Sequence, residues 1–160
     1  MLRVGQGYDL HKLKKGRNLI LCGEKIPFKK GLLGHSDADV ATHALIDSLL
    51  GAAALKDIGS HFPDSNENFK NINSLILLKK TVLILKNNNF KISNVDLTIV
   101  AKEPKLAPFI ERMKENIMPI LNIPKTAISI KATTEENLGI TKKGSCIACF
   151  SCCLIKEIKE

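Results

Sequence analysis

A short stretch of the chain concentrates the side chains that are most able to do chemistry. Residues 31–47 hold two of the four histidines, His35 and His43, together with three aspartates. Two of these, Asp39 and Asp47, flank His43 at intervals of four residues, so in a helix the three side chains would project from one face. A solvated polar face and a binding site are both consistent with this pattern.

The same stretch predicts a helix that begins at Ser36 and runs to about Leu55. Ser36 with Asp39 three residues later resembles a capping box. Apolar residues follow at helical spacing and form one stripe: Val40, Ala41, Ala44, Leu45, Leu49 and Ala52. His35 then lies just before the helix, where its side chain can lean over the N-terminus, a favourable place for a phosphate group.

A second pair of candidate metal ligands lies near the start of the chain. Residues 3–10 are predicted to form a strand, interrupted by two glycines, that leads to Asp9 and His11. Two residues apart in an extended segment, these side chains point to the same face. With His43 they would form a three-ligand tetrahedral site whose fourth position is open, as in catalytic zinc centres. Asp47 could orient the helix or its ligand. Polar surface groups without a metal are the alternative.

Hydrophobic periodicity predicts further elements of both kinds. Strands are expected at residues 19–22, 26–28, 91–101, 126–133 and 146–158. Helices are expected at residues 74–86 and 109–121, with Pro119 kinking or shortening the second. The sequence shows no internal repeat, linker or domain boundary. We therefore expect one domain over residues 1–160.

The composition is that of a globular protein with a basic balance. The chain has 24 Lys and Arg against 16 Asp and Glu, a net charge of +8, which favours an anionic ligand. Aromatic residues make up only 4%, which disfavours a stacking platform for nucleic acid. No apolar run reaches membrane-spanning length, and no signal-peptide pattern precedes Gly5. We expect neither a nucleic-acid nor a membrane partner.

Four of the five cysteines lie close together near the C-terminus. Without a secretory signal they suggest free thiols in a reducing compartment. Their spacing superficially resembles an iron–sulfur ligand run. In a strand, however, Cys146 and Cys152 would face away from Cys149 and Cys153, so the four thiolates could not converge. We expect these cysteines to be core residues.

Five motifs, in this order and spacing, resemble the 2-C-methyl-D-erythritol 2,4-cyclodiphosphate synthase family. They are Gly5-Gln-Gly-Tyr-Asp-Leu-His11, Gly34-His-Ser-Asp-Ala-Asp-Val40 through His43, Asp57-Ile-Gly59, Phe62-Pro-Asp64 and Lys131-Ala-Thr-Thr134. The resemblance covers essentially the whole chain. It implies an enzyme of the non-mevalonate isoprenoid pathway that acts on 4-diphosphocytidyl-2-C-methyl-D-erythritol 2-phosphate. The 2-phosphate would attack the β-phosphorus, closing the cyclic diphosphate and releasing CMP, a reaction that needs positioning and charge neutralisation.

The resemblance also assigns roles to individual residues. It implies zinc ligation by Asp9, His11 and His43, and a second divalent cation, Mg²⁺ or Mn²⁺, on Glu136. His35 and Thr134 would stabilise the transition state. The methylerythritol would be held by Asp57, Gly59, Phe62, Pro63, Asp64, Ser65 and Asn66. The cytidine phosphates would meet Ala101, Lys105, Leu106, Ala107 and Thr133. The expected substrate-binding set also includes Ser36, Ile58, Glu135, Ile140 and Lys143.

The same resemblance implies a homotrimer with three active sites at subunit interfaces. It also implies an α+β fold, with a mixed β-sheet packed on helices, in which the sheets of the three subunits line a central cavity that could hold an isoprenoid diphosphate. The implied location is the bacterial cytoplasm, or the plastid stroma if a transit peptide has been removed.

Departures from the family pattern keep two other functions open. Ile140, Lys142, Lys143 and Ser145 stand where the family usually has Phe, Gly, Arg and Glu, and Glu135 replaces a Thr. Lys143 keeps a positive charge but lacks the bidentate fork of Arg. One alternative is a non-catalytic trimer that binds metal, nucleotide or isoprenoid. The other is a zinc hydrolase of phosphate esters that activates water at the same site.

Overall fold

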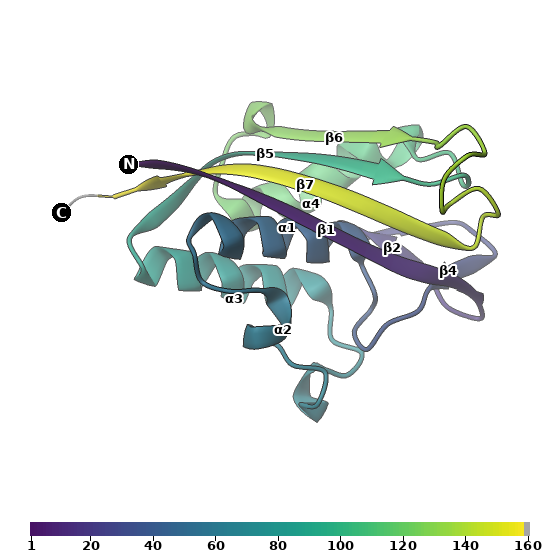
Figure 1. Cartoon of the computed structure of the whole chain (residues 1–160), viewed down its shortest axis with the longest axis horizontal. Helices are drawn as coiled ribbons and strands as arrows, with labels where there is room; N and C mark the ends of the chain where they lie inside the picture. The colour runs from purple at the N-terminus through teal and green to yellow at the C-terminus, as the bar shows by residue number, and fades with distance from the viewer. Residues whose placement is uncertain (159–160) are drawn as a thin grey trace.

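The computed structural model describes residues 1–158, which form a single α+β unit (Figure 1). The strands are β1 (Leu2–Lys15), β2 (Leu19–Leu21), β3 (Glu24–Ile26), β4 (Lys30–Leu32), β5 (Phe90–Val100), β6 (Ile128–Thr133) and β7 (Cys146–Glu157). The α-helices are α1 (Val40–Ala52), α2 (Ile58–His61), α3 (Ser74–Asn87) and α4 (Ile110–Leu121). Single 3₁₀ turns are η1 (Glu67–Phe69), η2 (Ala107–Phe109) and η3 (Lys125–Ala127).

Five strands form one mixed sheet in the order β4-β1-β7-β5-β6. β5 and β6 are parallel, whereas β1 pairs antiparallel with β4 and β7, and β7 pairs antiparallel with β5. β2 and β3 form a separate two-stranded ribbon. The expected mixed sheet packed on helices is therefore confirmed. Within residues 1–158, no helix is both long and apolar enough to cross a membrane.

The helices cover one face of this sheet, and α1 and α3 run side by side beneath it (Figure 1). α1 packs directly on β1 and β7. Gly5 and Gly7 permit this close approach, because a Cβ atom at either would lie 2.0 Å from a carbonyl oxygen of α1, that of Ser48 or of Ala44. The two glycines therefore do not interrupt β1, which continues to Lys15, beyond the predicted end. They set its distance from the helix that carries His43.

Several predicted boundaries were wrong. α1 begins at Val40 rather than near Ser36, since Asp39 is the N-cap residue and accepts a hydrogen bond from the Thr42 amide. The helix at residues 110–121 extends two residues past Pro119, which did not shorten it. The second short strand lies at 24–26 instead of 26–28, and residues 125–127 form a 3₁₀ turn before β6. The helix at 74–87 and the strands at 90–100 and 146–157 agree closely with the prediction.

The cysteines of β7 are mostly core residues, as expected. All five cysteines are free thiols, and Cys146, Cys149 and Cys153 are buried. Burial raises the pKa of the Cys153 thiol to about 11 and also raises that of Cys149. Cys152 contradicts the prediction, because its side chain is exposed on the sheet face that no helix covers.

That uncovered face carries large apolar side chains. Leu2 and Val4 of β1 are 61% and 69% exposed, and Tyr8 and Phe150 are each 45% exposed. The Tyr8 and Phe150 rings lie against each other with centroids 4.7 Å apart. These residues point away from the helices because they alternate along β1 and β7 with the helix-facing positions.

Candidate metal centre and substrate cleft

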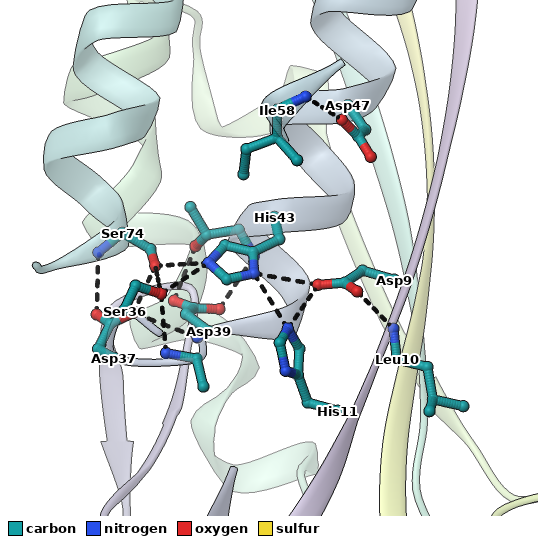
Figure 2. A network of polar contacts seen from close by, with 12 residues as sticks. Asp9, Leu10, His11, Ser36, Asp37, Asp39, His43, Asp47, Ile58 and Ser74 are labelled. Atoms are coloured by element: carbon teal, nitrogen blue, oxygen red, sulfur yellow. Dashed lines mark hydrogen bonds and ion pairs between the residues drawn. The ribbon is translucent and has the colours of Figure 1, made fainter. Parts of the chain in front are cut away.

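Asp9, His11 and His43 converge where β1 passes α1 (Figure 2). One ligand atom from each lies within 4.8 Å of the other two. The Asp9 Oδ2 atom is 2.9 Å from His11 Nε2 and 3.1 Å from His43 Nδ1, and the two ring nitrogens are 3.2 Å apart. The structure thus brings together two side chains from a strand and one from a helix, which the sequence could not place relative to each other.

Hydrogen bonds outside this cluster orient both imidazoles. His11 Nδ1 lies 2.7 Å from the Leu33 carbonyl oxygen, which only accepts hydrogen bonds, so the hydrogen of that ring is on Nδ1 and Nε2 is free to bind. His43 turns its Nε2 atom toward the hydroxyls of Ser36 and Ser74, at 3.1 and 3.0 Å. Its Nδ1 atom consequently faces Asp9 and His11.

The charges within the cluster are coupled. Burial alone would raise the pKa of Asp9, but the hydrogen bonds and charge attraction that the two imidazoles offer when protonated hold it well below its usual range. The pKa of His11 is raised, because its hydrogen bond and charge attraction to Asp9 outweigh the effect of burial. A carboxylate and two imidazoles are the donors that Zn²⁺ prefers in catalytic sites, and three protein ligands leave one position open. The residues present fit a zinc ion.

The three candidate ligands open into a cleft of about 420 Å³. Its lining includes eight of the predicted site residues in addition to the ligands: His35, Ser36, Ile58, Gly59, Phe62, Pro63, Asp64 and Ser65. The Nε2 atom of His35 is buried and has no hydrogen-bond partner among residues 1–158. A buried polar atom of this kind costs free energy unless a ligand or water satisfies it.

Two of the residues predicted to hold the methylerythritol do not line this cleft. Asp57 caps α2, with its Oδ1 atom accepting hydrogen bonds from the amide and hydroxyl of Ser60. Asn66 caps η1 by accepting from the Asn68 amide. Both side chains instead shape the segment that forms the cleft wall.

The predicted stripe of Asp39, His43 and Asp47 is only partly correct. His43 and Asp47 line the cleft, and Asp47 accepts a 2.7 Å hydrogen bond from the Ile58 amide. Asp39 is fully buried elsewhere and accepts hydrogen bonds from the amides of Cys22 and Gly23. It therefore ties the β2–β3 turn to the start of α1 and contributes nothing to the cleft.

Another group of predicted residues lies in the segment that follows β6. Thr134 and Glu136 line a pocket of about 350 Å³ that shares no lining residue with the cleft. The Thr134 hydroxyl donates to Glu136 at 2.5 Å. Glu135 also lines this pocket, and its Oε2 atom accepts hydrogen bonds from the amide and hydroxyl of Thr141, each at 2.7 Å.

A neighbouring pocket of about 280 Å³ collects the residues expected near the cytidine phosphates: Ala101, Lys105, Leu106, Ala107 and Thr133. Thr134 lines this pocket as well, so the two pockets are contiguous. Ile140 and Lys143 are exposed and line neither of them.

Sequence reasoning missed several residues of the site. Ser74 is fully buried and contacts His43. In the sequence it could be recognised only as the first residue of a predicted helix. Leu33 acts through its backbone carbonyl, so its residue type carried no signal. Asp37 was recognisable only as one carboxylate among three.

Comparison with known proteins matches residues 2–156 to the YgbB family. The chain belongs to the YgbB family. It is 56% identical over 154 residues to a Clostridium perfringens protein named 2-C-methyl-D-erythritol 2,4-cyclodiphosphate synthase, a match that covers 96% of this chain and 99% of that protein. The resemblance expected from the motifs is confirmed.

Two solved structures of YgbB-type proteins have the same fold. IspF of Plasmodium falciparum, in a CDP complex, matches 99% of this chain and 97% of its own, with a TM-score of 0.86 and 37% identity. The bifunctional IspDF from Campylobacter jejuni gives a TM-score of 0.95 at 38% identity over 99% of this chain. The chain spans 43% of that longer protein.

Proposed function

We propose that this YgbB-family chain converts 4-diphosphocytidyl-2-C-methyl-D-erythritol 2-phosphate into 2-C-methyl-D-erythritol 2,4-cyclodiphosphate and CMP, with zinc on Asp9, His11 and His43. The product is the compound after which its curated relatives are named. The observation that carries the proposal is the convergence of these three ligands at a cleft lined by the same chain's family motifs.

The protein's own residues mainly position the reacting groups and neutralise charge. Bound zinc would supply Lewis-acid stabilisation of a phosphate oxygen. His35 lines the cleft, and its imidazole, whose Nε2 atom has no hydrogen-bond partner among residues 1–158, would donate to a phosphate oxygen, a hydrogen bond that strengthens as charge develops there. The segment from Ile58 to Ser65 holds the methylerythritol against the centre. Intramolecular attack then needs no protein nucleophile, since both reacting phosphates belong to one molecule.

We assign the cytidine end of the substrate to the pockets beside β6. Lys105 supplies positive charge for the phosphates, and Thr133 and Thr134 offer hydroxyl donors. We assign the second divalent cation, Mg²⁺ or Mn²⁺, to Glu136, since one oxygen of the neighbouring Glu135 accepts two hydrogen bonds from Thr141. The CDP complex of the Plasmodium falciparum relative supports a nucleotide site in this fold.

A homotrimer would unite the two ends. The cleft and the Thr134 pocket share no lining residue within one chain, and we propose that a complete site takes one half from each of two neighbours. The uncovered sheet face, with Leu2, Val4 and Phe150, is the apolar surface that association would bury around a central cavity. An isoprenoid diphosphate is the ligand that we assign to such a cavity. We place the enzyme in the bacterial cytoplasm, consistent with its Clostridium relatives.

Phosphorus NMR of the purified protein with substrate, zinc and magnesium tests the reaction. We expect CMP and a cyclic diphosphate from the wild type, and neither from His43→Ala. Open-chain phosphate would instead identify a zinc hydrolase. Intact substrate together with bound zinc and CDP would identify a non-catalytic binding protein.

A further inference from the structure

Behind the metal centre, a chain of hydrogen bonds leads from His43 through Ser74 to Asp37 (Figure 2). Ser74 is fully buried at the first position of α3. Its hydroxyl lies 3.0 Å from His43 Nε2 and donates a short hydrogen bond to the Asp37 Oδ1 atom. The other carboxylate oxygen of Asp37 accepts from the Ser74 amide at 3.0 Å. Asp37 thus holds both polar groups of Ser74.

The direction of each hydrogen bond follows from what the groups can donate. The Asp37 carboxylate only accepts, so the single hydroxyl hydrogen of Ser74 points at Asp37. Toward His43 the Ser74 oxygen then offers only a lone pair, which requires a hydrogen on His43 Nε2. A neutral imidazole carries one hydrogen, so Nδ1 presents a lone pair toward the Asp9 Oδ2 atom 3.1 Å away, a pairing that a cation bound between the two atoms satisfies.

Ser36 does not reverse this assignment. Its oxygen accepts from the Ala38 amide at 3.1 Å and lies 3.1 Å from His43 Nε2 and 3.4 Å from the Ser74 oxygen. If Ser36 donated to a bare Nε2, the lone pairs of that nitrogen and of Ser74 would face each other at 3.0 Å with no hydrogen between them. A hydrogen on Nε2 lets Ser36 donate to Ser74 and removes this conflict.

We propose that Asp37 and Ser74 are positioning residues that fix the tautomer of His43, and that they thereby present its Nδ1 atom to the metal. The inference rests on the zinc site of the proposed function and names the groups that prepare it. It also links α3 to the metal centre through His43 alone, since Asp37 and Ser74 contact no ligand-binding atom of Asp9 or His11. Partners behind a metal-bound histidine are known to set ligand orientation and basicity.

Zinc affinity, measured by competition with a chromophoric chelator, tests the proposal without requiring turnover. In Asp37→Asn the side-chain NH₂ group would face either the hydroxyl or the backbone amide of Ser74, so one of these two hydrogen bonds is lost. Ser74→Ala removes the hydroxyl that links Asp37 to His43. Both should weaken zinc binding by about tenfold or more, whereas Ser74→Thr, which keeps the hydroxyl, should retain it. Asn73→Ala is the matched control. The Asn73 side chain caps α3 by accepting a hydrogen bond from the Leu75 amide, and it takes no part in the hydrogen bonds that join His43, Ser74 and Asp37. It should lower the melting temperature and leave zinc affinity unchanged.

Nitrogen-15 NMR of the zinc-loaded wild type provides a direct readout, because the protein has only four histidines. We expect His43 to be bound through Nδ1 and protonated on Nε2, and His11 to show the opposite pattern. Binding of His43 through Nε2 would overturn the proposal. So would wild-type zinc affinity in a folded Asp37→Asn protein, or equal weakening by Asn73→Ala.

These outcomes separate the inference from the proposed function. A wild type that binds no zinc would overturn the metal centre and the inference together. Zinc binding with the expected variant pattern but no cyclic product would leave the inference standing and remove the proposed reaction.

Discussion

The carboxylate of Asp47 accepts a 2.7 Å hydrogen bond from the backbone amide of Ile58. This contact joins α1, which carries the candidate metal ligand His43, to the first residue of the segment that walls the cleft. Asp47 is half-buried, and burial raises the pKa of its carboxyl group. One side chain therefore sets the distance between the metal centre and the proposed methylerythritol site.

We predict that Asp47→Ala raises KM more than it lowers kcat and leaves zinc content unchanged. Loss of the acceptor frees the Ile58 amide and loosens the cleft wall, at a cost of about 1–2 kcal/mol in the free energy of unfolding. Asp47→Asn keeps an acceptor oxygen and should behave nearly as the wild type. Steady-state kinetics and metal analysis of both variants check this. A loss of zinc in Asp47→Ala would show that Asp47 acts on the metal instead.

His35→Ala should reduce kcat by about two to three orders of magnitude while zinc binding stays intact, because a donor to the transition state is lost but no ligand is. The comparison with His43→Ala separates the two roles, since that variant should lose zinc as well. His61→Ala is the matched control, because the His61 Nε2 atom donates a 2.7 Å hydrogen bond to the Leu55 carbonyl oxygen and His61 does not line the cleft. Activity of His35→Ala close to that of His61→Ala would contradict the assignment.

Gly7→Ala should destabilise the fold by about 3 kcal/mol or more, because the new Cβ would lie 2.0 Å from the Ala44 carbonyl and force α1 away from β1. Gly51→Ala, in α1, is the control, because a Cβ atom there would lie 3.9 Å from its nearest neighbour, the Gln6 carbonyl oxygen. It should be neutral or stabilising by about 0.5–1 kcal/mol. Chemical denaturation measures both effects. Equal stability of the two variants would mean that the β1–α1 contact is looser than described.

The metal-free protein should show a pH-dependent contribution from Asp9 and His11. The raised pKa of His11 stabilises the fold fully below about pH 6.5 and loses this effect as the pH rises through the folded-state pKa. The lowered pKa of Asp9 stabilises the fold above about pH 3.9, an effect that is lost as the pH falls through the folded-state pKa. The pair therefore contributes most between these limits.

Thermal unfolding in the presence of a chelator measures this contribution as the difference between wild type and His11→Gln. The difference in melting temperature should be largest near pH 5 to 6, between the two reference pKa values, and should shrink toward alkaline pH. A difference that grows as the pH rises would contradict the coupling of the two groups.

Cys152 reports on whether the open sheet face is covered in solution. In the isolated chain its thiol is exposed, whereas Cys146, Cys149 and Cys153 are buried. If a homotrimer encloses this face, a bulky maleimide-polymer should fail to label native Cys152 but label all five cysteines after unfolding. Mass spectrometry counts the labels, and light scattering gives the oligomeric state. Rapid native labelling of a protein with the mass of one chain would contradict the trimer.

Much of the candidate site was predictable because it depends on local spacing. Asp9 and His11 share a strand face, and a histidine on the following helix completes a recognisable ligand set. The buried character of Cys149 and Cys153 was also predictable, since small apolar residues ran through a long strand. The start of α1 was not predictable, because Ser36 and Asp39 are both favourable N-cap residues and only the tertiary fold decides which of them caps the helix.

The sequence by itself determined the family, the residue types of the candidate metal ligands and most of the elements. The first two follow from residue identity, and the elements follow from hydrophobic periodicity. Tertiary structure alone decided which side chains meet. It placed the Asp39 carboxylate against the β2–β3 turn, joined Asp47 to Ile58, and put Ser74 next to His43 although 31 positions separate them in the chain. Hydrogen-bond partners across such separations are selected by how α1 packs on β1 and α3, and no local pattern encodes that packing.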